Sequence, residues 1–279
     1  MTKKKVPLVG GRAMGRVLIT GASAGIGAEL ARVFAKHGHK LALVARSEDK
    51  LKALAAELKS EFGTDAIVIA ADLGTMKGVA AVIAQLDKKK EEIDVLVNNA
   101  GLLEVGPFCD MPTDEVMKLV HLNIAALTQL TSVLVPRMVE RKFGRVLNVA
   151  SLAAFQPLPT MAVYAASKAY VLSLTEALSE ELRGTGVTLT ALCPGLTDTA
   201  MVAGVKARSA TAASLPSMLI SDPKEVARQG YSAVMAGRVI QVPGIPNQVS
   251  AAWAQVTPRW LTRTLTGFAA RRTDWAKRA

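Results

Sequence analysis

Three residues near the middle of the chain have the chemical types needed to move a proton. Tyr164 and Lys168 are four residues apart, and Ser151 stands thirteen residues before the tyrosine. On a helix, residues at i and i+4 share one face, so the phenol and the ammonium would lie side by side. A fixed cation favours the phenolate and lowers the tyrosine pKa from about 10, which suits a general acid or base at neutral pH. Ser151 could hydrogen-bond the same substrate oxygen. By itself, the pair is also compatible with a partly buried tyrosine beside a solvated lysine.

A glycine-rich segment near the N-terminus could bind a phosphate group. The sequence TGASAGIG at 20–27 follows an apolar run at 17–19 and opens a helical pattern. Glycine lets the chain turn tightly and lets a ligand approach the backbone, and the start of a helix presents free N–H groups to an anion. The alternative is a turn used only to pack a helix closely on a strand. The residues expected around the phosphate are Gly21, Ser23, Gly25, Ile26 and Gly27.

The elements that must position these residues alternate along the chain. Apolar runs indicate strands at 16–20, 40–45, 66–70, 93–97, 144–150, 187–193 and 239–242. Helical patterns cover 25–37, 48–62, 75–90, 112–141, 162–184 and 222–236. This alternation predicts an α/β fold, a single Rossmann-type doubly wound parallel sheet of about seven strands with helices on both faces. Apolar runs without alternation, such as 41–44, are typical of a sheet covered on both faces.

Together these motifs resemble the short-chain dehydrogenase/reductase family. TGASAGIG at 20–27, NNAG at 98–101, Asn123, Ser151, Tyr164-x-x-x-Lys168 and Pro194-Gly195 stand in the family's order and spacing over residues 14–245. The resemblance implies an oxidoreductase that interconverts a carbonyl and a secondary alcohol by hydride exchange with a nicotinamide cofactor. It implies a catalytic set of Ser151, Tyr164, Lys168 and Asn123.

Within that set, the resemblance assigns each residue a role. Tyr164 exchanges the proton, while Lys168 lowers the Tyr164 pKa and holds the nicotinamide ribose. Asn123 lies inside a helical stretch, an unfavourable place for asparagine by propensity, where family members distort the helix and hold a water that links the lysine to solvent. The alternative for Asn123 is a helix residue that faces solvent.

The resemblance also implies further cofactor contacts. Asp72 and Leu73 would flank the adenine, and Asn99, Ala100 and Gly101 would line the adenosine ribose. The nicotinamide carboxamide would meet Pro194, Gly195, Leu196, Thr197 and Thr199. The alternatives are that Asp72 caps the helix starting near Thr75 and that Asn99 is purely structural.

The residues after the second expected strand bear on the choice between the two nicotinamide cofactors. A site that prefers NAD places an acid there to accept hydrogen bonds from the ribose hydroxyls. This chain has Arg46 and Ser47 instead. A guanidinium pairs well with a 2′-phosphate, and a serine hydroxyl can assist it. We therefore expect NADP(H); the alternative for Arg46 is a solvated charge at a strand end.

Charge divides the chain into a nearly neutral body and two basic ends. The net charge is +11. Residues 1–16 hold five basic residues and no acid, and residues 253–279 hold six basic residues and one acid. We expect a basic tail at 1–13, a catalytic domain at 14–252 with a substrate flap at about 199–221, and a C-terminal segment at 253–279. A basic core that binds nucleic acid is not expected.

The cysteines and histidines indicate neither a disulfide framework nor a metal site. Cys109 and Cys193 show no metal-ligand spacing, which favours reduced thiols and a cytoplasmic protein. His37 and His39 follow an expected helix, where a cation suits the dipole. No metal is expected, and no run of eighteen apolar residues suggests a membrane-spanning helix.

The C-terminal segment has the pattern of a basic amphipathic helix. All three tryptophans lie at 253–275, and Thr257 can cap a helix that starts at Pro258. Trp260, Leu261, Leu265 and Phe268 then recur at helical spacing. Three hypotheses stay open: packing on the protein's own substrate entrance or a sister subunit, a position in an anionic membrane interface, or a nucleic-acid arm, which is the least favoured.

The sequence therefore predicts an NADP(H)-dependent oxidoreductase with a small carbonyl or alcohol substrate. The apolar residues after Ser151 and in the flap favour an apolar substrate. One alternative is a catalytically idle sensor or scaffold that binds NADP(H). Another is a membrane-peripheral reductase of lipid-like ketones or 3-oxoacyl thioesters. Family resemblance implies a homodimer or homotetramer built on the two long helices at 112–141 and 162–184.

Overall fold

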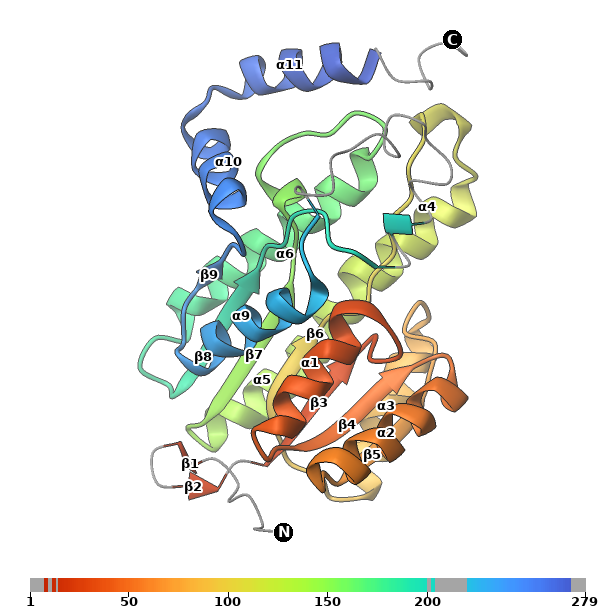
Figure 1. Ribbon diagram of the computed structural model, residues 1–279, viewed down its shortest axis with the longest axis vertical. Helices are drawn as coiled ribbons and strands as arrows, with labels where there is room; N and C mark the ends of the chain where they lie inside the picture. The colour runs from red at the N-terminus through yellow and green to blue at the C-terminus, as the bar shows by residue number, and fades with distance from the viewer. Residues whose placement is uncertain (1–7, 10–11, 14, 200–201, 204–219, 272–279) are drawn as a thin grey trace.

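The computed structural model describes residues 8–9, 12–13, 15–199, 202–203 and 220–271. Seven parallel strands form one sheet in the order β5-β4-β3-β6-β7-β8-β9 (Figure 1). The strands are β3 (Arg16–Thr20), β4 (Lys40–Ala45), β5 (Ala66–Ala70), β6 (Ile93–Asn98), β7 (Gly144–Val149), β8 (Val187–Leu192) and β9 (Ile240–Gln241). The predicted Rossmann-type α/β fold of seven strands is confirmed.

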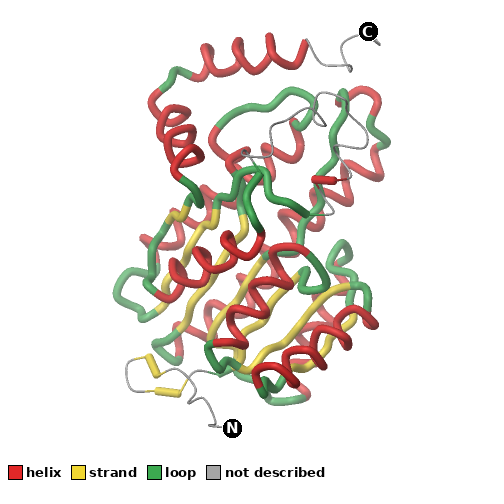
Figure 2. Tube along the Cα trace, in the orientation of Figure 1, coloured by secondary structure: helices red, strands yellow, loops and turns green. Residues whose placement is uncertain are grey.

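Helices cover both faces of this sheet (Figure 2). One face packs against α1 (Gly25–Lys36), α2 (Glu48–Phe62) and α9 (Pro223–Met235). The other packs against α3 (Met76–Lys88), α5 (Leu127–Glu140) and α6 (Ala162–Glu181). Because each parallel connection crosses over the sheet through a helix, both faces are buried and the strands need no polar side.

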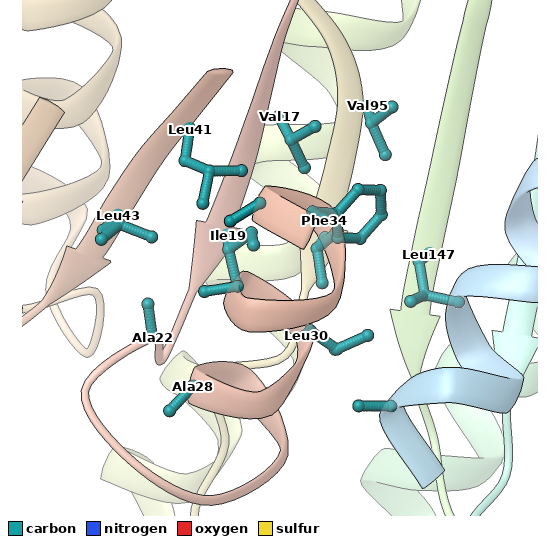
Figure 3. Close-up of a cluster of buried hydrophobic side chains, with 14 of the residues drawn as sticks. Val17, Ile19, Ala22, Ala28, Leu30, Phe34, Leu41, Leu43, Val95 and Leu147 are labelled. Atoms are coloured by element: carbon teal, nitrogen blue, oxygen red, sulfur yellow. The ribbon is translucent and has the colours of Figure 1, made fainter. Parts of the chain in front are cut away.

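Alternate residues of a single strand serve the two separate cores. In β3, Val17 and Ile19 pack beneath α1, whereas Leu18 faces the opposite core. Figure 3 shows Val17 and Ile19 around the fully buried ring of Phe34. Full burial of such a side chain contributes roughly 1.5–3 kcal/mol. The two cores therefore fix the strands whose carboxyl ends carry the loops.

The helix expected at 112–141 is interrupted. It consists of α4 (Thr113–Val120), a π-helical turn at His121–Ala126 and α5. By length and composition the stretch Thr113–Glu140 could cross a membrane. Its Leu130 and Leu134 are instead buried in the core against the sheet, as in the central helix of a doubly wound domain.

Some predictions about charge were wrong. Arg16, counted with the basic N-terminal end, is 4 % exposed and pairs with Asp65 and Glu91. His39 is not a cation at a helix end, because burial, followed by repulsion from His37, lowers the pKa of His39 to about 4. Within the described ranges, no cluster of His, Cys, Asp or Glu is placed to hold a metal ion.

A hairpin and one helix near the chain ends were not predicted from the sequence, whereas α11 (Arg259–Arg271) lies where a basic amphipathic helix was expected from Pro258. A hairpin of β1 (Leu8–Val9) and β2 (Arg12–Ala13) precedes the sheet. After β9 the chain forms α10 (Ile245–Val256) and then α11 (Arg259–Arg271). Thr257 does not cap α11 as expected, since its hydroxyl donates to the Trp253 carbonyl at the end of α10. Short 3-10 turns, Phe108–Asp110 and Leu152–Phe155, complete the elements.

Two predictions about segments remain open. The boundary proposed between a catalytic domain and a tail at 252/253 falls inside α10. Most of the flap predicted at 199–221 lies outside the described residues, which there include only 199, 202–203 and 220–221.

Candidate active site

A cleft of about 820 Å³ lies at the carboxyl ends of the parallel strands. Strand order reverses between β3 and β6, and ligands of open α/β sheets bind at such a switch point. The cleft is lined by residues that follow six successive strands of the sheet, namely Gly21, Arg46, Asp72, Asn99, Ser151 and Pro194. One cavity therefore gathers motifs that are up to 173 residues apart in the sequence.

The glycine-rich turn has the geometry of a cradle for an anion. Gly21 and Gly25 have φ of 65° and 55°, where other residues are strained. A Cβ on Gly27 would come within 2.3 Å of the Gly21 carbonyl, so this glycine permits close packing of α1 on the turn. Ala24, at the N-cap of α1, provides no side-chain cap, so the first N–H groups of the helix remain available for a phosphate.

Two exposed cations and a hydroxyl stand at the end of β4. Arg46, Ser47 and Lys50 all line the cleft. Ser47 is the N-cap residue of α2, yet its side chain makes no capping bond. Among the described residues, neither Arg46 nor Lys50 forms an ion pair. Sequence reasoning missed Lys50, although its position one helical turn after Ser47 gives it the same face.

Asp72 and Asn99 line the cleft and also shape its walls. The Asp72 carboxylate accepts from Gly74 N–H, while Thr75 and not Asp72 caps α3. The Asn99 amide donates to the carbonyls of Thr20 and Gly21 and so ties β6 to the glycine-rich turn. Asn99 thus has the structural role given as its alternative, and it also lines the cleft.

The hydroxyls of Ser151 and Tyr164 meet inside the cleft. Ser151 follows β7 and Tyr164 lies in the first turn of α6, and the Ser151 side chain is close enough to the phenol to lower the Tyr164 pKa in part. The Ser151 oxygen also accepts from the Ala153 N–H, which fixes its orientation. Both residues line the cavity, so a substrate oxygen could approach the two hydroxyls together.

Lys168 and Asn123 lie behind this pair and not on the cleft surface. Lys168 is 6 % exposed, donates to the Val149 carbonyl at 2.8 Å, and stands 5.7 Å from the Tyr164 ring centroid. Asn123 is 2 % exposed and sits in the π-helical turn. Its amide bonds both the N–H and the carbonyl of Leu102 and donates to Ser167, which excludes the solvent-facing alternative.

Gly101 brings the lysine and the asparagine together. A Cβ at Gly101 would lie 3.3 Å from Asn123 Oδ1 and 3.6 Å from Lys168 Nζ. Asn123 lies within the π-helical turn, and its side chain bonds the Leu102 backbone. We infer that these bonds stabilise the local departure from regular α-helix. Glycine in the NNAG motif therefore keeps the space between the two polar groups open.

The expected direction of the Tyr164 pKa was wrong for this arrangement. Burial raises the pKa of Tyr164 above its ordinary value, and the Ser151 hydrogen bond lowers it in part. Burial also lowers the pKa of Lys168 to about 8, with a smaller opposing effect of Cys193. The fully buried Cys193 thiol has its pKa raised to about 12, chiefly by burial. Desolvation outweighs the charge of Lys168 here because the ammonium is bonded to a backbone carbonyl instead of the phenol oxygen.

Apolar side chains make up much of the remaining cleft wall, and sequence reasoning did not place most of them. The unpredicted lining residues include the apolar Leu102, Leu103, Leu122, Leu158, Met161 and Val202, and the polar Lys118 and Gln156. Most of them come from loops, from α4 and from the π-helical turn, whose approach to the site depends on tertiary packing. Thr197 and Thr199 line the cleft as expected, together with Gly195 and Leu196.

Comparisons with known proteins agree with this geometry. Residues 15–210 match the family model described as short chain dehydrogenase. A short chain dehydrogenase of Pseudocercospora fijiensis is 39 % identical over 180 residues, which span 64 % of this chain and 58 % of that protein. The ketoacyl reductase HetN of Nostoc sp. is 36 % identical over 78 % of this chain and 74 % of its own.

Solved structures extend the likeness to almost the whole chain. A short-chain dehydrogenase from Sphingobium yanoikuyae, in complex with NADPH, is 32 % identical with a TM-score of 0.76 and covers 92 % of this chain and 96 % of its own. The bulky-bulky ketone specific alcohol dehydrogenase from Comamonas testosteroni is 30 % identical with a TM-score of 0.73, covering 92 % and 94 %. The chain therefore belongs to the short-chain dehydrogenase/reductase family and is an oxidoreductase that binds a nicotinamide cofactor.

Proposed function

We propose that this protein is an NADP(H)-dependent reductase of apolar ketones, acting reversibly on the corresponding secondary alcohols. The observation that carries the proposal is that Ser151 and Tyr164 line the same cleft, with the buried cation of Lys168 behind them. When bound, the nicotinamide group would donate or accept the hydride.

Each polar residue then has one task. Tyr164 gives its proton to the carbonyl oxygen during reduction, and Ser151 donates a hydrogen bond that orients the same oxygen. Lys168, charged below a pKa of about 8, stabilises the phenolate that remains. Asn123 holds the Leu102 backbone and the Ser167 hydroxyl and so positions α6, which carries both the tyrosine and the lysine.

Preference for NADP(H) is supported by the charge at the end of β4. Arg46 and Lys50 face the cleft together with Ser47, and residues 45–47 include no acid. A 2′-phosphate would bring negative charge to these cations, whereas the free 2′-hydroxyl of NAD would find no carboxylate at residues 45–47 to accept its hydrogen bond. The Sphingobium yanoikuyae neighbour was solved with NADPH, which agrees with this preference.

An apolar substrate is supported by the cleft wall around the two hydroxyls. Leu102, Leu152, Leu158 and Met161 contribute apolar surface to the cleft, to which Lys118 on α4 adds one charge. The Comamonas neighbour is described as specific for bulky ketones, and HetN as a ketoacyl reductase. The idle-sensor alternative is disfavoured, because a sensor would have no need to bury Lys168 beside a reactive hydroxyl pair.

The proposal is tested by NADPH oxidation with a panel of bulky apolar ketones, 3-oxoacyl thioesters and small polar ketones. We expect turnover with the apolar members and a fall in kcat of about 10²- to 10⁴-fold in Tyr164→Phe, with the NADPH dissociation constant nearly unchanged. Tyr170→Phe, on the same helix but outside the cleft, is the control. Substantial turnover in Tyr164→Phe would contradict the proton-transfer role. Faster turnover with NADH at equal concentration would contradict the cofactor preference.

A further inference from the structure

The two C-terminal helices expose most of the large apolar side chains on the described surface. Seven of the thirteen exposed large hydrophobic residues in the described ranges lie on α10 and α11. They are Ile245, Val249, Trp253, Val256, Trp260, Leu265 and Phe268. Isolated exposed apolar residues are ordinary, but seven of them on two consecutive helices indicate an interaction surface.

On α10 these residues form one uncharged stripe. Ile245, Val249, Trp253 and Val256 recur at intervals of four, four and three, so they share one helix face. Ile245 is 75 % and Val256 81 % exposed. The opposite face packs on the protein: Ala251 is 5 % exposed, and Asn247 contacts Gly195 beside the cleft. The stripe is therefore held outward on a docked helix.

On α11 the apolar residues are combined with positive charge. Trp260, Leu265 and Phe268 lie among exposed Arg259, Arg263 and Arg271. Residues 245–271 contain no Asp or Glu. One face of the helix is covered, since Thr262 is 3 % exposed. Figure 1 shows α10 and α11 at the end of the molecule opposite the N-terminal hairpin.

We propose that α10 and α11 form a docking surface for an anionic lipid membrane. Tryptophan favours the headgroup region, the aliphatic stripe favours the acyl boundary, and arginines attract acidic lipids. The absence of acids in this segment favours lipid over a second copy, because a two-fold contact through α11 would bring the arginines of both copies together. This proposal does not rest on the proposed function, because binding is measured without turnover.

Membrane binding is measured by flotation of the full chain with phosphatidylcholine vesicles, with and without phosphatidylglycerol. We expect flotation only with the acidic lipid, and a loss on raising salt from about 0.1 M to about 1 M, which shortens the Debye length from about 10 Å to about 3 Å. Val249→Ser with Val256→Ser, and separately Arg259→Gln with Arg263→Gln, should each lower vesicle partition about tenfold or more.

Matched controls change residues of the same types elsewhere. Met76→Ser with Met117→Ser removes two exposed apolar groups from α3 and α4, and Lys88→Gln with Lys89→Gln removes two exposed cations from the end of α3. Both controls should float like the native chain, and thermal unfolding checks that every variant folds. The proposal would be overturned if the native protein floated no better with phosphatidylglycerol vesicles than with phosphatidylcholine alone. It would also be overturned if the Val249→Ser, Val256→Ser variant floated like the native protein. Light scattering adds a further test of the oligomeric state. If the native protein were a dimer that did not float, and the Val249→Ser, Val256→Ser variant were a monomer, the surface would be assigned to a second copy of the chain instead.

Discussion

The two ends of the cleft differ, although both are built at the carboxyl ends of neighbouring strands. Around the hydroxyl pair, Lys168 and Asn123 are almost fully buried, and each is bonded to backbone atoms of another segment. At the end of β4, Arg46 and Lys50 are exposed. One end thus holds its cation by burial and hydrogen bonds, whereas the other presents cations to solvent.

This difference should govern how each end responds to change. A charge in a low-dielectric interior interacts strongly with its neighbours and costs free energy to desolvate. An exposed charge is screened by water and salt, and its pairings are worth little. Substitutions at the buried end should therefore alter both catalysis and stability, while those at the exposed end should alter only cofactor affinity, and modestly.

The largest effect is expected for Lys168→Met, which keeps the length of the side chain and removes its charge. The kcat should fall by about 10²- to 10⁴-fold, because the Tyr164 phenolate loses its cation. The cofactor-free protein should not lose stability at pH 7, since the lysine pKa of about 8 lies below the ordinary 10.4 and marks a desolvation cost of roughly 3 kcal/mol.

The pH dependence of that cost has a definite sign. Between pH 8 and about 10.4 the unfolded chain keeps the lysine proton while the native state has released it, so native stability rises with pH in this window. Relative to Lys168→Met, the native protein should therefore gain free energy of unfolding from pH 7 to pH 10 in urea titrations. A difference between the two proteins that is constant across these pH values would show that burial does not penalise the charge.

An intermediate effect is expected for Gly27→Ala at the phosphate cradle. The new Cβ would lie 2.3 Å from the Gly21 carbonyl and 2.4 Å from Asn99 Nδ2, so α1 must move away from the turn. We expect a stability loss of about 1–3 kcal/mol, together with a clear rise in the NADPH dissociation constant.

Gly63→Ala is the matched control for this substitution. Gly63 ends α2 with φ of 69°, but a Cβ there would meet nothing within 4 Å. It should cost about 1–2 kcal/mol through backbone strain and leave NADPH affinity unchanged. Calorimetric titration distinguishes the two: equal NADPH affinity in both variants would mean that the close approach of α1 to the turn is not needed for binding.

The sequence predicted the fold well because its signals are local. The apolar run at 41–44 and the turn at 20–27 each specify their own backbone, and β4 and α1 begin and end within a residue of expectation. The interruption of the helix at Asn123 was predicted from the family resemblance. Helix propensity alone could not predict it, because the bonds from Asn123 to Leu102 join two separate segments.

Predictions failed where burial or packing between distant segments decided the outcome. The direction of the Tyr164 pKa depends on desolvation and on the bond from Lys168 to Val149, which helical spacing alone does not reveal. Arg16 seemed part of a basic tail in composition, but it is buried between two carboxylates. Helix α10 was missed because it contains no charged residue, so its sequence lacks the charged face opposite an apolar stripe that identifies a surface helix.

The smallest effect, expected at the exposed end, tests the comparison most directly. Arg46→Ala and Lys50→Ala should each weaken NADPH binding by about 3- to 10-fold, leave NADH binding unchanged and leave stability unaltered, because both side chains are exposed. Lys52→Ala is the control, since Lys52 lies on the same helix but pairs with Glu48 and does not line the cleft. An NADPH dissociation constant within a factor of two of native in Arg46→Ala would refute the assignment of the 2′-phosphate site.

Because screening weakens exposed charges, the losses should shrink at about 1 M salt. A loss that persists there would mean that bound cofactor buries these cations, and the contrast between the two ends would then hold only for the cofactor-free protein.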